Sequence, residues 1–348
     1  MTVRASTDID AVELPKVHVH AHLDGSYPRE AVERLARRRG VPFDFPDQFV
    51  DVWDFFDHYG RVPELVENLS DLITLCAELV AAEAAEGVVF FEPAIEPQLF
   101  APRLGSIDRV TATIVTALQE AAAEHDLQVG ANVTINTDQD APIANEIARA
   151  AIRWAGDGVT AIGTAGFREP ADYRPYVSAV RSAADAGLQV VAHAGQIEGR
   201  LSVLAALDEI GATRISHGVL AAEHPDVLAR LADNRIVCDV CPVSNVRLGV
   251  SRNIREHQVA DLVAAGVPVT LNGDDSLWFG HGVSDQYTIV AAELAWDAHT
   301  IAAIARNGSL LPALTEERRL QLLAGIDKWE KSEDGSGPPG RRTRESLA

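Results

Sequence analysis

The sequence is poor in cysteine and lacks long hydrophobic runs. Its 348 residues include three cysteines, an odd number without the regular spacing of a disulfide framework. No apolar run approaches the roughly 20 residues that a membrane span needs. The polar residues 1–10 also lack the charged-then-apolar layout of a signal peptide. We therefore expect a cytoplasmic protein with no membrane partner.

Basic residues are scarce relative to acidic ones. The chain has 30 Lys and Arg against 51 Asp and Glu, a formal net charge of −21. Proteins bind nucleic-acid phosphates through clusters of Lys and Arg, so this balance argues against a nucleic-acid partner. At 47% hydrophobic residues the chain can bury a large core. No linker or internal repeat divides it, so we expect one domain over 1–332 and a disordered tail over 333–348.

Cys238 and Cys241 have the C-x-x-C spacing of redox and zinc motifs. They lie in a strand-like run, where positions three apart point to opposite faces. We interpret the pair as core packing or incidental spacing, and redox chemistry is the alternative.

Short β-branched runs alternate with amphipathic segments along the chain. Strands are predicted over 16–22, 87–93, 127–135, 158–165, 188–194, 212–218, 235–240 and 267–274. Their near-continuous hydrophobicity is typical of parallel strands buried on both faces. Helices are predicted over 28–40, 62–87, 108–126, 172–187 and 200–211, and over 287–309 and 314–333 near the end of the chain. The order predicts an α/β fold, a TIM-type (β/α)8 barrel with extra C-terminal helices.

Unusual polar residues stand where these strands end, the edge at which such barrels carry their catalytic groups. They are His20, His22, His193, His217, Asp274 and Asp275. Alternation along a strand puts His20 and His22 on one face, so one ion can take both nitrogens. A third His and a carboxylate complete a nitrogen-rich site that favours Zn²⁺. His18 shares that face one step deeper, and we expect it to be a buried, hydrogen-bonded neighbour of the site.

The segments around these residues resemble the motifs of the adenosine deaminase family, within the amidohydrolase superfamily. The first strand reads LPKVHVHAHLDGS, close to the family's P-K-x-x-x-H-x-H-L-D-G. In chain order follow GVVFFEP, AIGTAGF, VAHAGQ, RISHG, CPVSNVRLG and LNGDDSLWF. The likeness spans roughly residues 14–330. It implies a metal-dependent hydrolase that acts on C–N bonds other than peptide bonds, with a nucleoside-like small molecule as substrate.

The resemblance also implies roles for individual residues. The implied ligands of one Zn²⁺ per chain are His20, His22, His193 and Asp274. His217 is implied as the base or electrostatic partner of the attacking water, with Asp274 also catalytic. The implied substrate-binding residues are Asp275 and Gly166 at the purine ring, and Asp24 with His22 at the ribose end. Alternatively, Gly166 is a turn residue and Asp24 caps the helix that begins near Pro28.

Several positions depart from the family pattern. The family has H-A-G-E where this chain has HAGQ, so Gln196 replaces the acid that protonates the ring. An amide donates or accepts a hydrogen bond but transfers no proton, and a positioned acid contributes about 10² to 10⁴ in rate. Glu198 follows, and we expect it to point away. Ala94 replaces the family's Arg, Glu96 changes the charge of the pocket wall, and Gly273 is expected to loosen the loop before Asp274.

Three hypotheses follow from these departures. The first is a zinc hydrolase of the deaminase fold with an altered substrate, whose ring needs no strong acid at Gln196. The second is an ordinary adenosine deaminase with reduced rate. The third is a catalytically silent protein that binds metal and nucleoside.

Two aromatic groups adjoin the expected site. The segment 43–56 is expected to pack in the core, with a hydrophobic gate as the alternative. Trp278 and Phe279 follow Asp275 and are candidates for stacking on a base.

Overall fold

The computed structural model describes residues 9–333, except 47, 167–171 and 198. Of the predicted tail 333–348, only Glu333 falls in this part, as the last residue of α17 (Glu316–Glu333). A search of the described helices finds none that is both long and apolar enough to cross a membrane.

Two parallel sheets form the centre of the molecule. The first has the order β1-β2-β4 and the second β10-β9-β8-β7-β6-β5-β3. The bounds are β1 (Lys16–His18), β2 (Val88–Phe91), β3 (Ala94–Ile95), β4 (Gln128–Val129), β5 (Ala131–Asn136), β6 (Val159–Ala165), β7 (Gln189–Ala194), β8 (Arg214–His217), β9 (Val237–Val240) and β10 (Val269–Leu271). Most strand residues are buried, as expected where helices cover a parallel sheet.

Backbone contacts close the two sheets into a barrel. Single parallel bridges join Ala21 to Asp274 and His22 to Ala94. The amide of His22 donates to the Asp274 carbonyl at 3.1 Å, and the amide of Asp274 donates to the His20 carbonyl at 3.0 Å. The first and last strands therefore meet, and the predicted TIM-type barrel is confirmed.

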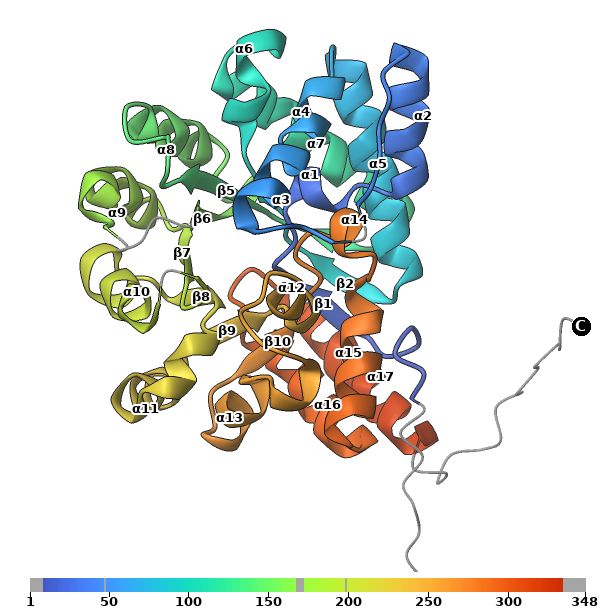
Figure 1. The fold of residues 1–348 in the computed structure, drawn as a ribbon, viewed down its shortest axis with the longest axis vertical. Coiled ribbons are helices and arrows are strands. Elements are labelled where there is room, and N and C mark those ends of the chain that lie inside the picture. Colours follow the sequence, from blue (N-terminus) through green and yellow to red (C-terminus); the bar gives the residue numbers. More distant parts are fainter. Residues whose placement is uncertain (1–8, 47, 167–171, 198, 334–348) are drawn as a thin grey trace, which may run out of the picture.

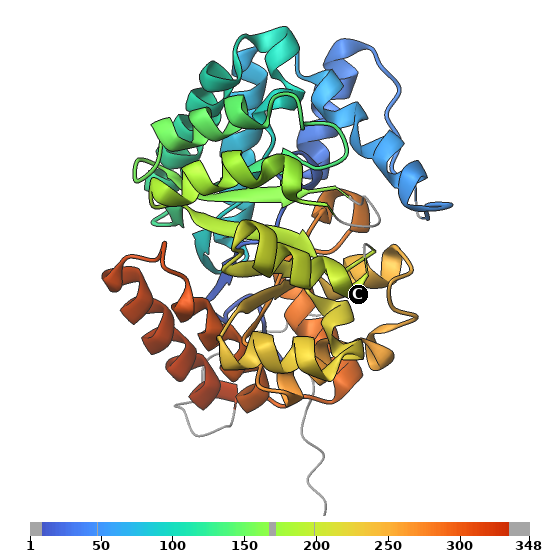
Figure 2. The same ribbon diagram turned by 90° about the vertical axis from the view of Figure 1, so that its left-hand side faces the viewer.

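Helices surround the strands on the outside (Figure 1). The outer helices are α2 (Arg29–Arg39), α5 (Leu69–Ala85), α7 (Ile107–Glu124), α8 (Ala144–Arg153), α9 (Val177–Asp185), α10 (Arg200–Ala205), α11 (Pro225–Asp233), α13 (Val259–Ala264), α15 (Val283–Leu294), α16 (Ala298–Arg306) and α17. Shorter helices are α1 (Leu23–Ser26), α3 (Val52–Tyr59), α4 (Arg61–Leu65), α6 (Ala101–Leu104), α12 (Pro242–Arg247) and α14 (Ser276–Phe279). Figure 2 shows the N-terminal half of the barrel stacked on the C-terminal half.

Some predicted element bounds are wrong. The segment 62–87 forms two helices, because the chain is extended at Val66 and the Asn68 side chain caps α5 by accepting from the Asp71 amide at 3.0 Å. The segment 287–309 likewise divides into α15 and α16 at Ala295, whose φ is 53°. The first strand pairs regularly only to His18, and Ala21 and His22 continue it as single bridges.

Candidate active site

The four predicted ligands meet at the carboxyl ends of the strands. The ring nitrogens of His20, His22 and His193 lie within 4.8 Å of one another. Oδ1 of Asp274 lies 3.4 Å from Nε2 of His20 and 3.4 Å from Nε2 of His22. Two donor atoms at tetrahedral positions around Zn²⁺, each about 2.0–2.1 Å from it, are about 3.3 Å apart. The spacing of the cluster thus fits one small metal ion.

The hydrogen bonding of His20 leaves its Nε2 available to bind a metal ion. Its Nδ1 donates to the Asp239 carbonyl at 2.9 Å, which fixes the proton there and leaves a lone pair on Nε2. Nε2 of His20 and Oδ1 of Asp274 are both buried and have no hydrogen-bond partner within the described chain. Buried polar atoms without partners are costly, so these two fit a bound cation.

The charge states of His22 and Asp274 suit a metal, whereas at His20 burial is outweighed by Asp274, which raises the pKa of that imidazole. Burial lowers the pKa of His22 to about 3, so its imidazole is neutral near pH 7. Burial opposes ionisation of Asp274, but His20, His217 and His22 together hold its pKa well below the ordinary value. Neutral imidazoles and an ionised carboxylate are the forms that bind metals.

His217 lies beside the cluster. Its Nε2 is 3.0 Å from Nε2 of His193 and 3.7 Å from Oδ2 of Asp274. Burial, and then the neighbouring imidazoles of His20 and His193, lower the pKa of His217 well below its ordinary value. His217 and Asp274 both have left-handed backbone, with φ of 69° and 61°. Such strain costs of order 1–3 kcal/mol per residue and concentrates at functional sites.

Cys241 reaches the same cluster from the end of β9. Its sulfur lies within 4.8 Å of donor atoms of His20, His217 and Asp274. Burial, followed by Asp274, raises the pKa of this thiol well above its ordinary value, so it stays protonated and is a poor ligand. Cys241 and Cys238 are buried and free, which agrees with the interpretation that they pack in the core.

A cavity of about 410 Å³ opens above the cluster. Its lining includes His22, His193, Asp274, Asp275 and Gly166 from the predicted site, whereas His20, His217, Asp24 and Gln196 lie outside the lining. The lining also includes four aromatic residues, Trp53, Phe55, Phe56 and Tyr59. Its polar residues include Glu64, Glu96, Asn136, Asp138 and Gln139. The size is within the usual range for small-molecule pockets.

The aromatic segment packs in part into the core, as expected, and in part lines the cavity. Phe55 is buried against Phe279, whereas Trp53 is 60% exposed and lines the cavity. Trp278 and Phe279, the candidates for stacking on a base, are both buried. Trp278 packs against Phe43 and Phe45, at ring centroid distances of 5.9 and 5.6 Å, and neither Trp278 nor Phe279 lines the cavity.

Asp275 enters the cavity from the N-terminus of α14. A Cβ atom on Gly25 would lie 1.7 Å from its Oδ1, so only glycine at position 25 leaves room for this carboxyl group. Burial, and then Asp274 and Asp24, raise the pKa of Asp275 well above its ordinary value. The protonated carboxyl group can donate a hydrogen bond to a ligand.

Gly166 and Asp24 differ in their relation to the cavity. Gly166 follows β6, has φ of 107° and lines the cavity. Asp24 lies within α1 and is buried behind the lining, and burial raises its pKa to about 7. The cap alternative for Asp24 is wrong, because α2 follows Pro28 without a side-chain cap.

Two further departures, Gln196 and Gly273, are described by the structure and do not line the cavity. Gln196 is buried directly after β7 and is 1% exposed, while Glu198 lies outside the described residues. The amide of Gly273 donates to Nε2 of His18 at 2.9 Å, which ties the loop before Asp274 to the first strand. His18 itself is buried and bonds Glu83 through Nδ1 at 2.7 Å, as expected for a neighbour of the site.

Sequence reasoning placed Glu96 on the pocket wall but did not foresee its protonation, and it missed Ser244, Asn245 and His257 as functional candidates. Glu96 is buried and lines the cavity, and burial together with Asp140 and Asp24 raises its pKa to about 8. Ser244 donates to Oδ2 of Asp274 at 2.5 Å, and Asn245 contacts His217. The quoted CPVSNVRLG motif contains Ser244 and Asn245. No sequence signal marks the next partner, His257.

Comparison with known proteins agrees with this geometry. The sequence model of the family described as adenosine deaminase matches residues 15–329. An adenine deaminase of Mesorhizobium japonicum is 31% identical, over 90% of this chain and 98% of its own. An aminodeoxyfutalosine deaminase of Streptomyces coelicolor is 32% identical, over 91% of this chain and 84% of its own.

Solved structures show the same fold. The crystal structure of an adenine deaminase from Arthrobacter aurescens matches with a TM-score of 0.83 and 25% identity, over 91% of this chain and 99% of its own. An amidohydrolase from Burkholderia ambifaria, solved with bound Zn, matches with a TM-score of 0.83 and 21% identity, over 93% of each chain. The protein is an enzyme, a hydrolase that acts on C–N bonds by hydrolytic deamination. The chain belongs to the adenosine deaminase family.

Proposed function

We propose that this protein is a zinc-dependent hydrolase that deaminates an unphosphorylated aminopurine or related heterocycle, and that its substrate needs no proton from residue 196. One observation carries the proposal: His20, His22, His193 and Asp274 form a cluster, and Gln196, a buried amide at the family's acid position, follows His193 by three residues. The proposed ligands are His20, His22, His193 and Asp274, within a single domain over 1–332.

The donor set favours zinc among common divalent ions. Three imidazoles and one carboxylate are typical zinc ligands, and such a site leaves room for a further oxygen ligand. A zinc ion held there would lower the pKa of a water molecule toward neutrality and so supply a nucleophile. His217 would orient that water, while Asp275 and the backbone at Gly166 would hold the ring.

Gln196 decides which rings can react. Its amide can donate a hydrogen bond to a ring nitrogen or accept one from a ring N–H, but it cannot supply the proton that adenosine needs. A ring that is readily protonated, or that already carries the proton, avoids this step. We therefore place adenosine itself among the slower substrates.

The charge of the cavity wall favours an unphosphorylated ligand. Glu64, Glu96 and Asp138 line the cavity, and Arg103 is the one Lys or Arg among its described lining residues. The Arg103 guanidinium donates to the backbone carbonyls of Val66 and Pro63. A phosphate group would meet these carboxylates, so we expect bases and nucleosides to bind better than nucleotides.

A substrate panel on purified, zinc-loaded protein tests this proposal. Adenine, adenosine, AMP, aminopyrimidines and their nucleosides are incubated with the protein, and ammonia release and mass change are both measured. We expect release from an unphosphorylated heterocycle that exceeds release from adenosine. Adenosine as the best substrate would instead identify an ordinary adenosine deaminase, and full metal content without any release would identify a silent binding protein.

A further inference from the structure

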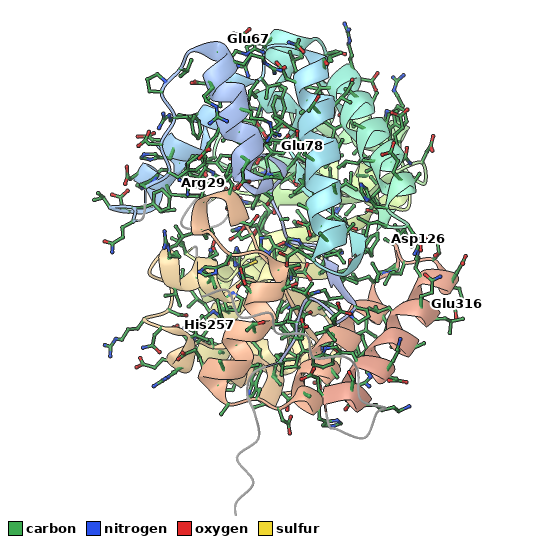
Figure 3. The ribbon with its side chains drawn as sticks, turned by 90° about the vertical axis from the view of Figure 1, so that its right-hand side faces the viewer. Arg29, Glu67, Glu78, Asp126, His257 and Glu316 are labelled. Carbon is green, nitrogen blue, oxygen red and sulfur yellow. The ribbon has the colours of Figure 1, made fainter. Side chains whose placement is uncertain are left out.

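A hydrogen-bond chain connects His217 to a fixed backbone donor. It begins at Val259, whose amide donates to Nδ1 of His257 at 3.0 Å. A backbone N–H can only donate, so Nδ1 of His257 is an unprotonated acceptor. Burial lowers the pKa of His257 to about 4, so the ring is neutral and its proton is on Nε2. Figure 3 labels His257 in the C-terminal half of the barrel.

The next link is the side-chain amide of Asn245. Nε2 of His257 lies 3.1 Å from Oδ1 of Asn245, and Nδ2 of Asn245 lies 3.2 Å from Nδ1 of His217. The Nε2–H of His257 must face an acceptor, which assigns Oδ1 of Asn245 to that side. The NH₂ group of the Asn245 side chain therefore faces His217 and donates to its Nδ1.

The opposite order of donors is chemically excluded. If the amide were turned round, its NH₂ group would require a second acceptor nitrogen on His257. A ring with two acceptor nitrogens is an imidazolate anion, and a buried site does not stabilise that charge. Asn245 is 0% exposed and His257 is 2% exposed, so water does not compete for these bonds.

The geometry points to Asn245 and His257 as positioning residues that hold neutral His217 with its proton on Nε2. Nε2 is the atom that faces His193 and Asp274, at 3.0 and 3.7 Å. His217 then presents an N–H donor to the reaction site instead of a lone pair. It therefore stabilises an oxygen by hydrogen bonding and does not take a proton through Nε2.

The tautomer of His217 can be measured directly. Zinc-loaded protein labelled with ¹⁵N at histidine gives ring nitrogen shifts that distinguish N–H from bare nitrogen, and His217→Gln identifies the signal by its loss. We expect N–H at Nε2 and bare Nδ1 in the parent protein. The reverse pattern in the parent protein would overturn the inference, and this measurement needs no substrate.

Asn245→Asp tests the same chain by reversing its polarity. A carboxylate accepts but does not donate, so it should draw the His217 proton to Nδ1. A histidine held in the wrong tautomer can lower turnover by about 10⁴ in a hydrolase. We expect kcat to fall by about 10² to 10⁴, with KM and zinc content near those of the parent. An unchanged ¹⁵N pattern with unchanged kcat would contradict the inference.

Two variants of His257 separate positioning from packing. His257→Gln keeps an N–H donor for Asn245, whereas His257→Phe keeps a buried ring without one. We expect His257→Gln to retain the parent tautomer and most of kcat, and His257→Phe to lose both while zinc stays bound. Equal kcat in the two variants, each folded by circular dichroism, would mean that His257 serves only packing. The kinetic measurements rest on the proposed function, but the ¹⁵N pattern does not.

Discussion

Replacing Glu96 by Gln should make the protein more stable at alkaline pH. Glu96 is buried in the cavity wall, and its pKa is raised from 4.5 to about 8 by burial, Asp140 and Asp24. Between these two values the folded protein keeps a proton that the unfolded chain has lost. The contribution of Glu96 to the free energy of unfolding is therefore fully present below about pH 4.5, and it is lost as pH rises through 8. The side-chain amide of the Glu96→Gln variant would remain neutral throughout.

The size of the effect follows from the pKa shift. Each pH unit across which the two states differ by one proton changes the free energy of unfolding by about 1.36 kcal/mol. From pH 5 to pH 8 the interval is about three units, so the stability gained by Glu96→Gln should grow by about 4 kcal/mol. The carboxyl groups of Asp24, Asp138, Asp140 and Asp275 act on Glu96 in the parent and are present in both proteins, so their own titration largely cancels in the difference.

Urea unfolding of parent and variant at pH 5 and pH 8 measures this difference. Glu64→Gln is the matched control, because Glu64 lines the same cavity but is exposed. We expect Glu64→Gln to follow the pH dependence of the parent. If Glu96→Gln does so too, Glu96 is ionised in the folded protein at pH 7 and the reasoning about its burial is refuted.

Three further predictions concern the reaction site. The double variant His20→Ala, His193→Ala should lose the bound ion in elemental analysis, and full retention would refute the proposed ligand set. His217→Ala should abolish turnover of the best panel substrate with metal content intact, whereas loss of the metal would make His217 a ligand. Gln196→Glu should lower kcat/KM for that substrate, because an amide donor is lost and an unsatisfied buried partner costs about 1–3 kcal/mol. A rise of about 10² in kcat/KM for adenosine without such a loss would identify an impaired adenosine deaminase.

The sequence by itself determined the barrel and the cluster at its carboxyl edge. Hydrophobic runs with a helix between them allow few arrangements, and parallel strands bring their carboxyl ends to one edge. Residues that end separate strands, such as His22, His193 and Asp274, therefore had to meet. Hydrophobic patterning did not predict the helix break at Val66, because the capping hydrogen bond of Asn68 sets the start of α5. It also did not predict that β1 ends at His18, because His22 continues the strand only as a single bridge.

Only the tertiary structure decided the protonation states and the outer contacts of the site. The raised pKa of Glu96 results from burial and from neighbouring carboxyl groups that the folded chain brings near it. The tautomer of His217, at the end of β8, depends on Asn245, His257 and the backbone amide of Val259, which all lie in the segment between β9 and β10. A pKa shift or a tautomer depends on distances between side chains in the folded protein, and these distances cannot be predicted from spacing along the sequence.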